Sequence, residues 1–264
     1  GHWYGVFYYE LLSRFIHPGY FAMYLSFSFF ILIYQFMSEK RARVKGFIVV
    51  LLLFLLGMIV LLSSRTPVIS LIVVLFILSP IFFFTKSNRK IFFIVFPTLI
   101  LVVLGFAYRN SQWNRFSSIK NYFGQSKINP STTESVEARM LVWKSSLQII
   151  SKNIFTGVGT TNAKKTLVAQ YVKNGYTGIA AEELNAHNEY LQTFIAVGVF
   201  GFIALLISIF GSLVSAFRKK DFLLLGFIFI IAFNFVTESM LERQAGVVFF
   251  AFFNSLLVFA NSST

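Results

Sequence analysis

Long apolar stretches separated by short polar connections dominate this sequence. A helix needs about 20 apolar residues to cross the hydrocarbon core of a bilayer, with a range of roughly 17 to 25. Seven apolar stretches come close to this length. The sixth and seventh, at residues 222–236 and 245–260, are short by this measure, and the fifth, at residues 190–217, is long enough to be tilted or to begin outside the lipid. The pattern predicts an all-α integral membrane protein, a polytopic helical bundle of about seven spans. These lie at residues 18–37, 46–62, 68–84, 91–107, 190–217, 222–236 and 245–260.

The overall composition supports lipid as the solvent. Of 264 residues, 56% are hydrophobic, 19% are aromatic and 12% are charged, and the mean hydropathy is +0.73. This is too much apolar surface for one soluble core. The chain has no cysteine and three histidines, which excludes disulfides and thiol chemistry and disfavours a transition-metal cage. We therefore expect no cofactor and no metal.

The short connections set an orientation, because Lys and Arg accumulate on the cytoplasmic side of a membrane. Three connections are strongly basic, and the other two short ones hold one basic residue each, Arg65 and Arg243. The long connection then faces outside, as does the start of the chain. The basic residues of the three cytoplasmic connections are Lys40, Arg41, Arg43 and Lys45; Lys86, Arg89 and Lys90; and Arg218, Lys219 and Lys220.

The opening residues indicate part of a longer protein. The sequence starts with Gly1 rather than Met, and the aromatic run that follows lacks the basic and apolar regions of a signal peptide. We expect missing N-terminal spans. The predicted organisation is an interfacial segment at 1–17, four transmembrane helices at 18–107, a large periplasmic loop at 108–189 and three transmembrane helices at 190–264.

The long loop is too long for a simple turn, so it carries either function or disorder. It is strongly basic, which also suits a solvated face near anionic lipid headgroups. Ser131 and Glu134 have capping-box spacing, and apolar residues then recur at steps of three and four. This predicts an amphipathic helix that ends near Asn153, before Gly157 and Gly159. Its predicted apolar stripe consists of Val136, Met140, Trp143, Leu147 and Ile150.

A few polar side chains at the outer ends of the spans are candidates for chemistry. His187 is either a general base or an interfacial polar residue. Arg65 is held by a short turn and matches phosphate oxygens, either on a substrate or on a lipid. Arg139 is either a ligand-binding or a snorkelling arginine. Glu238, Glu242 and Arg243 share the last outer turn, where they could instead form an internal ion pair.

Together, Arg14, Arg65, Arg139, Arg243 and His187 offer cations and one base. This set suits a substrate with a good leaving group, such as a lipid-linked diphosphate. The arginines would neutralise the diphosphate, and the base would deprotonate an attacking hydroxyl. Proteolysis fits poorly, because neither a His-Glu-x-x-His nor a Gly-x-Ser-x-Gly motif is present.

Four ordered segments resemble the O-antigen ligase and O-antigen polymerase family of bacterial envelope glycosyltransferases. They are RFIHPGYFA from Arg14, Ser64-Arg65 before an apolar span, Arg139 and Trp143 followed by Gly157-Val158-Gly159, and AHNEYL from Ala186 followed by Gly198 and Gly201. The resemblance covers Arg14 to about Leu257 and matches the C-terminal part of the family.

The resemblance implies a metal-independent glycosyltransferase of the membrane-embedded C-type fold in the bacterial inner membrane, with its active site facing the periplasm. The donor would be a glycan on undecaprenyl diphosphate, displaced with inversion. His187 would correspond to the catalytic base, and Arg65, Arg139 and, more weakly, Arg14 to diphosphate-binding residues. Asn188, Tyr190, Glu238 and Arg243 would support the site.

The acceptor stays open. Lipid A-core would make the chain a ligase, a second glycan repeat a polymerase, and a serine or threonine a protein O-oligosaccharyltransferase. A non-enzymatic alternative is a lipid-linked glycan transporter or membrane scaffold, although no internal repeat is visible. Membrane lipids are expected partners, and nucleic acid is not.

Overall fold

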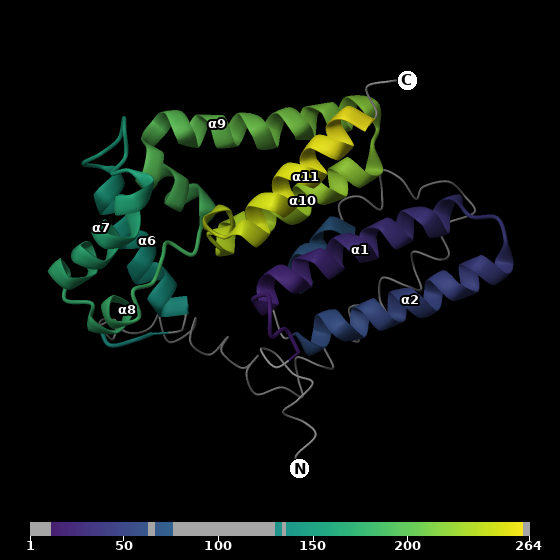
Figure 1. The fold of residues 1–264 in the computed structure, drawn as a ribbon, viewed down its shortest axis with the longest axis horizontal. Coiled ribbons are helices and arrows are strands. Elements are labelled where there is room, and N and C mark those ends of the chain that lie inside the picture. The colour runs from purple at the N-terminus through teal and green to yellow at the C-terminus, as the bar shows by residue number, and fades with distance from the viewer. Residues whose placement is uncertain (1–11, 63–66, 76–129, 134–135, 261–264) are drawn as a thin grey trace, which may run out of the picture. The chain divides into compact units, whose positions relative to one another are not determined.

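The structure is a computed structural model that describes residues 12–62, 67–75, 130–133 and 136–260 (Figure 1). The described residues form helices and no strand, which confirms the all-helical prediction for this part of the chain. The chain divides into two compact units. The first contains residues 1–106, 211–234 and 244–264, and the second contains residues 107–210 and 235–243.

Two antiparallel helices, α1 (Pro18–Ser38) and α2 (Ala42–Leu61), begin the first unit (Figure 1). Pro18 occupies the first turn of α1, where its missing N–H costs nothing, and the His17 side chain accepts a hydrogen bond from the Gly19 N–H at 3.2 Å. In the turn between the helices, the Arg41 side chain and backbone donate to Glu39 and lower its pKa to about 2.

Phenylalanine rings pack α1 against α10 (Phe222–Thr237) and α11 (Gln244–Ala260). The Phe27 ring lies 5.1 Å from the rings of both Phe227 and Phe253, and Phe30 stacks on Phe222 at 4.4 Å. Gly226 lies directly against the Phe30 ring, where a Cβ would overlap it. Ring shape therefore decides how these helices fit together.

Three described helices are long and apolar enough to cross a membrane: α1, α2 and α9 (Glu189–Lys219). Helices α10 and α11 are shorter and also apolar, as the sequence predicted for these stretches. Residues 67–75 are helical, at the start of the predicted third span. The rest of that span and the fourth predicted span lie outside the described residues.

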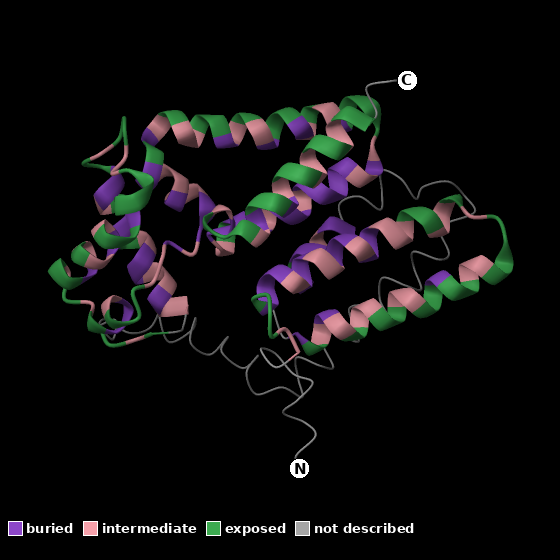
Figure 2. Ribbon diagram, viewed as in Figure 1, coloured by how far each residue is buried: buried purple, intermediate pink, exposed green. Residues whose placement is uncertain are grey.

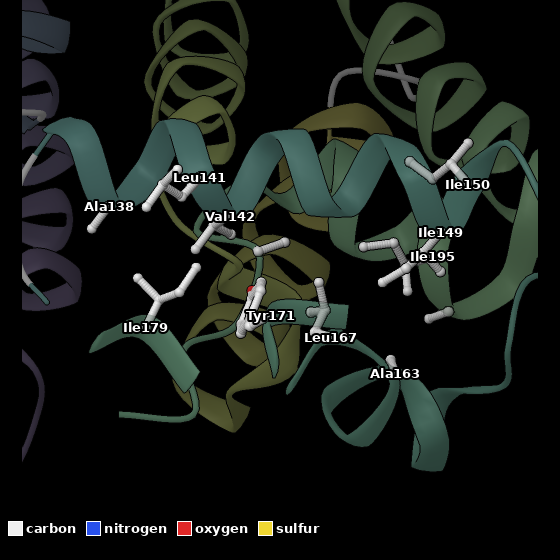
Figure 3. Close-up of a cluster of buried hydrophobic side chains, with 12 residues drawn as sticks. Ala138, Leu141, Val142, Ile149, Ile150, Ala163, Leu167, Tyr171, Ile179 and Ile195 are labelled. Carbon is white, nitrogen blue, oxygen red and sulfur yellow. The ribbon is translucent and has the colours of Figure 1, made fainter. Parts of the chain in front are cut away.

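The second unit has a hydrophobic core of its own (Figure 3). Helices α6 (Val136–Ile150), α7 (Thr160–Lys173) and α8 (Thr177–Ala181) surround it together with the start of α9. Leu141, Leu167, Tyr171 and Ile179 are each no more than 1% exposed. The described part of the predicted loop is therefore a folded unit that resembles a soluble domain in its packing.

Helix α6 exists as predicted, and its predicted apolar stripe is correct in part, because Ile150 belongs to the core and Trp143 packs against it. Leu147 is 58% exposed, while Ala138, Ser145 and Ser146 are buried. Both serine hydroxyls donate to the carbonyl four residues earlier, so their burial leaves no donor unpaired. Small residues on this face also leave room for neighbouring helices, which a count of large apolar residues overlooks.

Helix α9 is interrupted at Gly198, which has a φ of 67° and a ψ of −163°. The turn over residues 154–159 fills the interruption. The Val199 N–H donates to the Ile154 carbonyl at 2.8 Å, and the Gly159 N–H donates to the Ala196 carbonyl at 2.9 Å. The predicted fifth span is thus two helical segments, and the first of them belongs to the second unit.

Candidate functional site

His187 lies in the turn that leads into α9, and its neighbours hold this turn from three sides. The Trp143 indole N–H donates to the Ala186 carbonyl at 3.1 Å, and the Ala186 N–H donates to the Gln192 side chain at 3.1 Å. The His187 N–H donates to the Asn185 side chain, also at 3.1 Å. His187 has a φ of 43°, a left-handed conformation that needs such support.

The Glu238 carboxylate lies between His187 and Arg139. One oxygen is 3.4 Å from His187 Nδ1, and the other is 3.3 Å from an Arg139 terminal nitrogen. The three residues come from the turn before α9, the segment after α10 and the first described turn of α6, all within the second unit. The structure thus brings together three of the residues that the sequence singled out.

The spacing of Arg139 and Trp143 on α6 now has a physical reason. Residues four apart lie one turn apart on the same face of a helix. From that face, Trp143 holds the Ala186 carbonyl, and Arg139 reaches the carboxylate that faces His187. One helix therefore positions the histidine turn and supplies a cation beside it.

Asn188 acts as the cap of α9. Its side-chain oxygen accepts from the Leu191 N–H at 3.0 Å, as an N-cap residue does, and its amide donates to the Val236 carbonyl at 3.0 Å. Its own N–H donates to the Ser239 hydroxyl at 3.3 Å. Asn188 therefore joins the start of α9 to the segment that carries Glu238.

Two further carboxylates hold the same segment. Glu189 is 2% exposed, and its oxygens accept from the Thr193 hydroxyl and from the Leu241 N–H, each at 2.7 Å. Leu241 belongs to the 3₁₀ helix η4 (Met240–Glu242). Glu242 accepts from the Gln192 amide and from the Asn185 amide, the latter at 2.7 Å. These bonds fix η4 against the histidine turn.

A buried phenol completes this framework. The Tyr171 hydroxyl donates to the Leu184 carbonyl at 3.1 Å, three residues before His187. Burial, and secondly the negative charge of Glu242, raise the pKa of Tyr171 above its ordinary value. The phenol therefore stays protonated, as this hydrogen bond requires.

The other predicted site residues lie elsewhere or outside the described part. The Tyr190 ring packs edge-on against Phe235, with 6.1 Å between the ring centroids. Arg243 and Arg14 are exposed, and Arg14 belongs to the first unit. Arg65 lies outside the described residues. A role for Arg14 or Arg65 beside His187 stays a prediction.

The sequence interpretation gave no role to Asn185, Glu189 or Gln192. A signal for them was available. Polar residues cluster on both sides of His187, at the start of an otherwise apolar helix, where each buried polar group needs a partner. Their partners are about 50 residues later in the chain, so the pattern alone cannot identify them.

Within the described ranges, no group of three or more His, Cys, Asp or Glu side chains is placed to hold a metal ion. The metal independence of the site stays a prediction. The arrangement offers an imidazole, a carboxylate in contact with it and a guanidinium group close by.

The sequence matches a known protein family. Residues 50–206 match the family described as O-antigen ligase, which is more than half of the chain and includes Arg139, Trp143 and His187. No curated protein matches the chain.

Proposed function

Because this chain belongs to the O-antigen ligase family, we propose that it transfers a glycan from undecaprenyl diphosphate to an acceptor hydroxyl at the periplasmic face of the inner membrane. The observation that carries the proposal is the contact of one carboxylate, Glu238, with both His187 and Arg139. When a hydroxyl displaces a diphosphate, the hydroxyl loses a proton and the diphosphate gains negative charge. A base can accept that proton, and a cation beside the base can stabilise that negative charge.

His187 is the base in this proposal. In the tautomer that donates from Nδ1 to Glu238, Nε2 is left to accept a proton. The acceptor oxygen bonds to the anomeric carbon of the glycan as the bond from that carbon to the diphosphate oxygen breaks. The diphosphate leaves with the electron pair, and the hydroxyl proton passes to His187 Nε2. This displacement inverts the anomeric centre.

Glu238 orients the imidazole and stabilises the positive charge that His187 gains. A carboxylate performs both tasks for the histidine of a serine protease triad. The left-handed backbone of His187 and the bonds around Ala186 hold the ring toward Glu238 before any substrate arrives. Such preorganisation lowers the cost of reaching the transition state.

Arg139 neutralises the leaving diphosphate. Its side chain is 40% exposed, and among the described residues Glu238 is its hydrogen-bond partner, through one terminal nitrogen. The remaining donors of the guanidinium fork match phosphate oxygens. We assign the same task to Arg65, and a weaker one to Arg14, on the sequence resemblance. Arg243, exposed beside η4, is a supporting residue.

The test uses the full-length protein in lipid nanodiscs, labelled undecaprenyl-diphosphate glycan and three acceptors assayed separately: lipid A-core, a glycan repeat and a protein. His187→Ala should lower the rate of transfer at least about 100-fold, the usual range for a general base, while the donor still binds. Arg139→Ala should weaken donor binding. The acceptor that is used separates ligase, polymerase and protein-modifying activities.

Lys144→Ala is the matched control, because Lys144 is an exposed cation on the same helix as Arg139. It should leave donor binding and the rate unchanged. If His187→Ala retains full transfer, His187 is not the base. If the wild-type protein carries the intact lipid-linked glycan across a membrane and transfers nothing, the transporter alternative replaces the proposal.

A further inference from the structure

The part of α9 that follows the interruption has the length of a membrane span. Residues Val199–Lys219 extend for about 30 Å at 1.5 Å per residue, which matches the hydrocarbon thickness of a bilayer. Arg218 and Lys219 occupy its last turn, and cations are typical of a cytoplasmic end. Gly198 therefore marks the level at which α9 enters the outer side of the hydrocarbon.

One face of this segment is apolar and exposed. Phe200, Ile203, Ile207 and Phe210 follow each other at steps of three and four, and they are 46–70% exposed. The exposed side of α9 is visible along its length in Figure 2. In a helix that is long and apolar enough to cross a membrane, such a stripe faces lipid.

The turn in the α9 interruption continues this stripe. Phe155 is 69% exposed and Ile154 is 44% exposed, although both are large apolar residues. The Ile154 carbonyl accepts from the Val199 N–H, directly beside Phe200. Exposed Lys152 and Thr156 flank the pair. An apolar tip between polar neighbours is typical of a segment that enters the membrane interface.

The backbone holds this tip rigidly. Gly157 has a φ of 66°, and a Cβ there would come within 2.6 Å of the Gly198 nitrogen. Gly198 is in turn so close to the Phe155 carbonyl that it has no space for a Cβ. The two glycines bring the turn against α9 with no side chain between them. The tip therefore stays at the level where α9 enters the lipid.

We propose that Ile154 and Phe155 form a membrane-inserted tip, which anchors the second unit to the outer leaflet through contact with lipid acyl chains. The occupant of this surface is lipid, because the surface is continuous with the lipid-facing stripe of α9. This inference is independent of the catalytic roles of His187 and Arg139. It requires only that α9 spans the membrane.

Residues 1–264 contain no cysteine, so single-cysteine variants permit a direct test once any cysteine elsewhere in the full-length protein has been replaced. Single-cysteine variants Phe155→Cys, Phe200→Cys and Lys164→Cys of the full-length protein are labelled with an environment-sensitive fluorophore and placed in nanodiscs. The lipids carry a spin label near the headgroup, which quenches a nearby fluorophore. The label at position 200 reports on the lipid-facing stripe of α9. Lys164 is a polar control, 56% exposed and paired with Glu183 at 2.8 Å.

The label at position 155 should emit at shorter wavelength than the label at 164 and be quenched to the same extent as the label at 200. The label at 164 should not be quenched. The proposal is overturned if position 155 matches position 164 in both readouts while position 200 is quenched. Position 155 would then face water or a protein partner. Neither result depends on glycan transfer, so the proposed function and this proposal fail separately.

Discussion

Phenylalanine rings pack the first unit, whereas hydrogen bonds between buried polar side chains fix the second unit around its hydrophobic core. In the first unit, α1, α10 and α11 meet through rings such as Phe27 and Phe30. In the second, the Glu189 and Gln192 side chains are almost completely buried, and both accept hydrogen bonds. Ring contacts tolerate small shifts, but hydrogen bonds need defined distances and angles. The unit with directional contacts is the one that contains His187.

The largest expected effect comes from the backbone contact of the second unit. Gly198→Ala introduces a Cβ against the Phe155 carbonyl, at a residue with φ of 67°. Because the new Cβ overlaps a backbone carbonyl, a change of side-chain rotamer cannot relieve the overlap. We expect a loss of at least about 3 kcal/mol in the free energy of unfolding, measured by denaturation in detergent micelles.

Gly211→Ala is the control, because this glycine lies on the same helix and has open space around its Cα. It should change stability by less than about 0.5 kcal/mol. Equal losses in the two variants would show that α9 merely disfavours alanine. The close approach of the turn to Gly198 would then not contribute to the stability of the protein.

A similar substitution in the first unit should destabilise the protein less, and a second substitution should partly restore the stability. Gly226→Ala places a Cβ against the Phe30 ring, which is a side chain that can yield. Overpacking of this kind costs about 1–3 kcal/mol. Gly57→Ala, in open space on α2, should be close to neutral. Both variants are compared with wild type by the same denaturation in micelles.

Trimming the ring distinguishes the two units. Combining Gly226→Ala with Phe30→Leu should destabilise the protein less than the sum of the two single changes, because the smaller side chain makes room for the new methyl group. For Gly198→Ala, the companion change Phe155→Ala should bring no such recovery, since the obstacle there is the Phe155 carbonyl. Recovery in both pairs would remove this distinction.

The polar framework should respond no more strongly than Gly226→Ala, and only locally. Glu189→Gln keeps the shape of the side chain but replaces one acceptor oxygen by a donor group, so either the Leu241 N–H or the Thr193 hydroxyl loses a partner. The cost should be about 1–3 kcal/mol. Hydrogen exchange at Leu241 should accelerate, and kcat should fall more than KM rises, since η4 holds the segment of Glu238.

Glu182→Gln provides the comparison, as Glu182 is exposed on the end of α8. It should leave exchange at Leu241 and the transfer kinetics unchanged. Unaltered exchange at Leu241 in Glu189→Gln would contradict the role given to Glu189. A fall in kcat with normal exchange would indicate direct contact of Glu189 with substrate instead.

Apolar length predicts most of the described helices of the first unit closely. The predicted segments 18–37 and 222–236 correspond to Pro18–Ser38 and Phe222–Thr237. This works because the requirement for about 20 apolar residues is local in sequence. The interruption at Gly198 was not predicted, because a glycine inside an apolar run has the same hydropathy pattern in a continuous helix and in a broken one.

The candidate site was predicted in its parts and not in its assembly. Arg139, His187 and Glu238 were all singled out, the first two on motifs. Glu238 is 51 residues from His187 and 99 from Arg139 along the chain, and no periodicity within one segment reports such a contact. Helix α7 was missed, although Ala163, Leu167 and Tyr171 at steps of four line its buried face.

The smallest effect is expected at a surface ion pair of the second unit. Lys164 Nζ lies 2.8 Å from a Glu183 oxygen, but the two side chains are 56% and 60% exposed. The bond from Lys164 lowers the pKa of Glu183. The pair therefore stabilises the folded state at pH values above the ordinary pKa of a glutamate, and this contribution disappears as the pH falls through the lowered value.

A double-mutant cycle with Lys164→Ala and Glu183→Ala measures this coupling. Solvent screens exposed charges, so the coupling should be the smallest of the changes described, weaken further in high salt and vanish in acid. A coupling that stays constant across salt and pH would show that the pair is joined by packing rather than by charge. Directed contacts would then stabilise the second unit at its surface as well as in its interior.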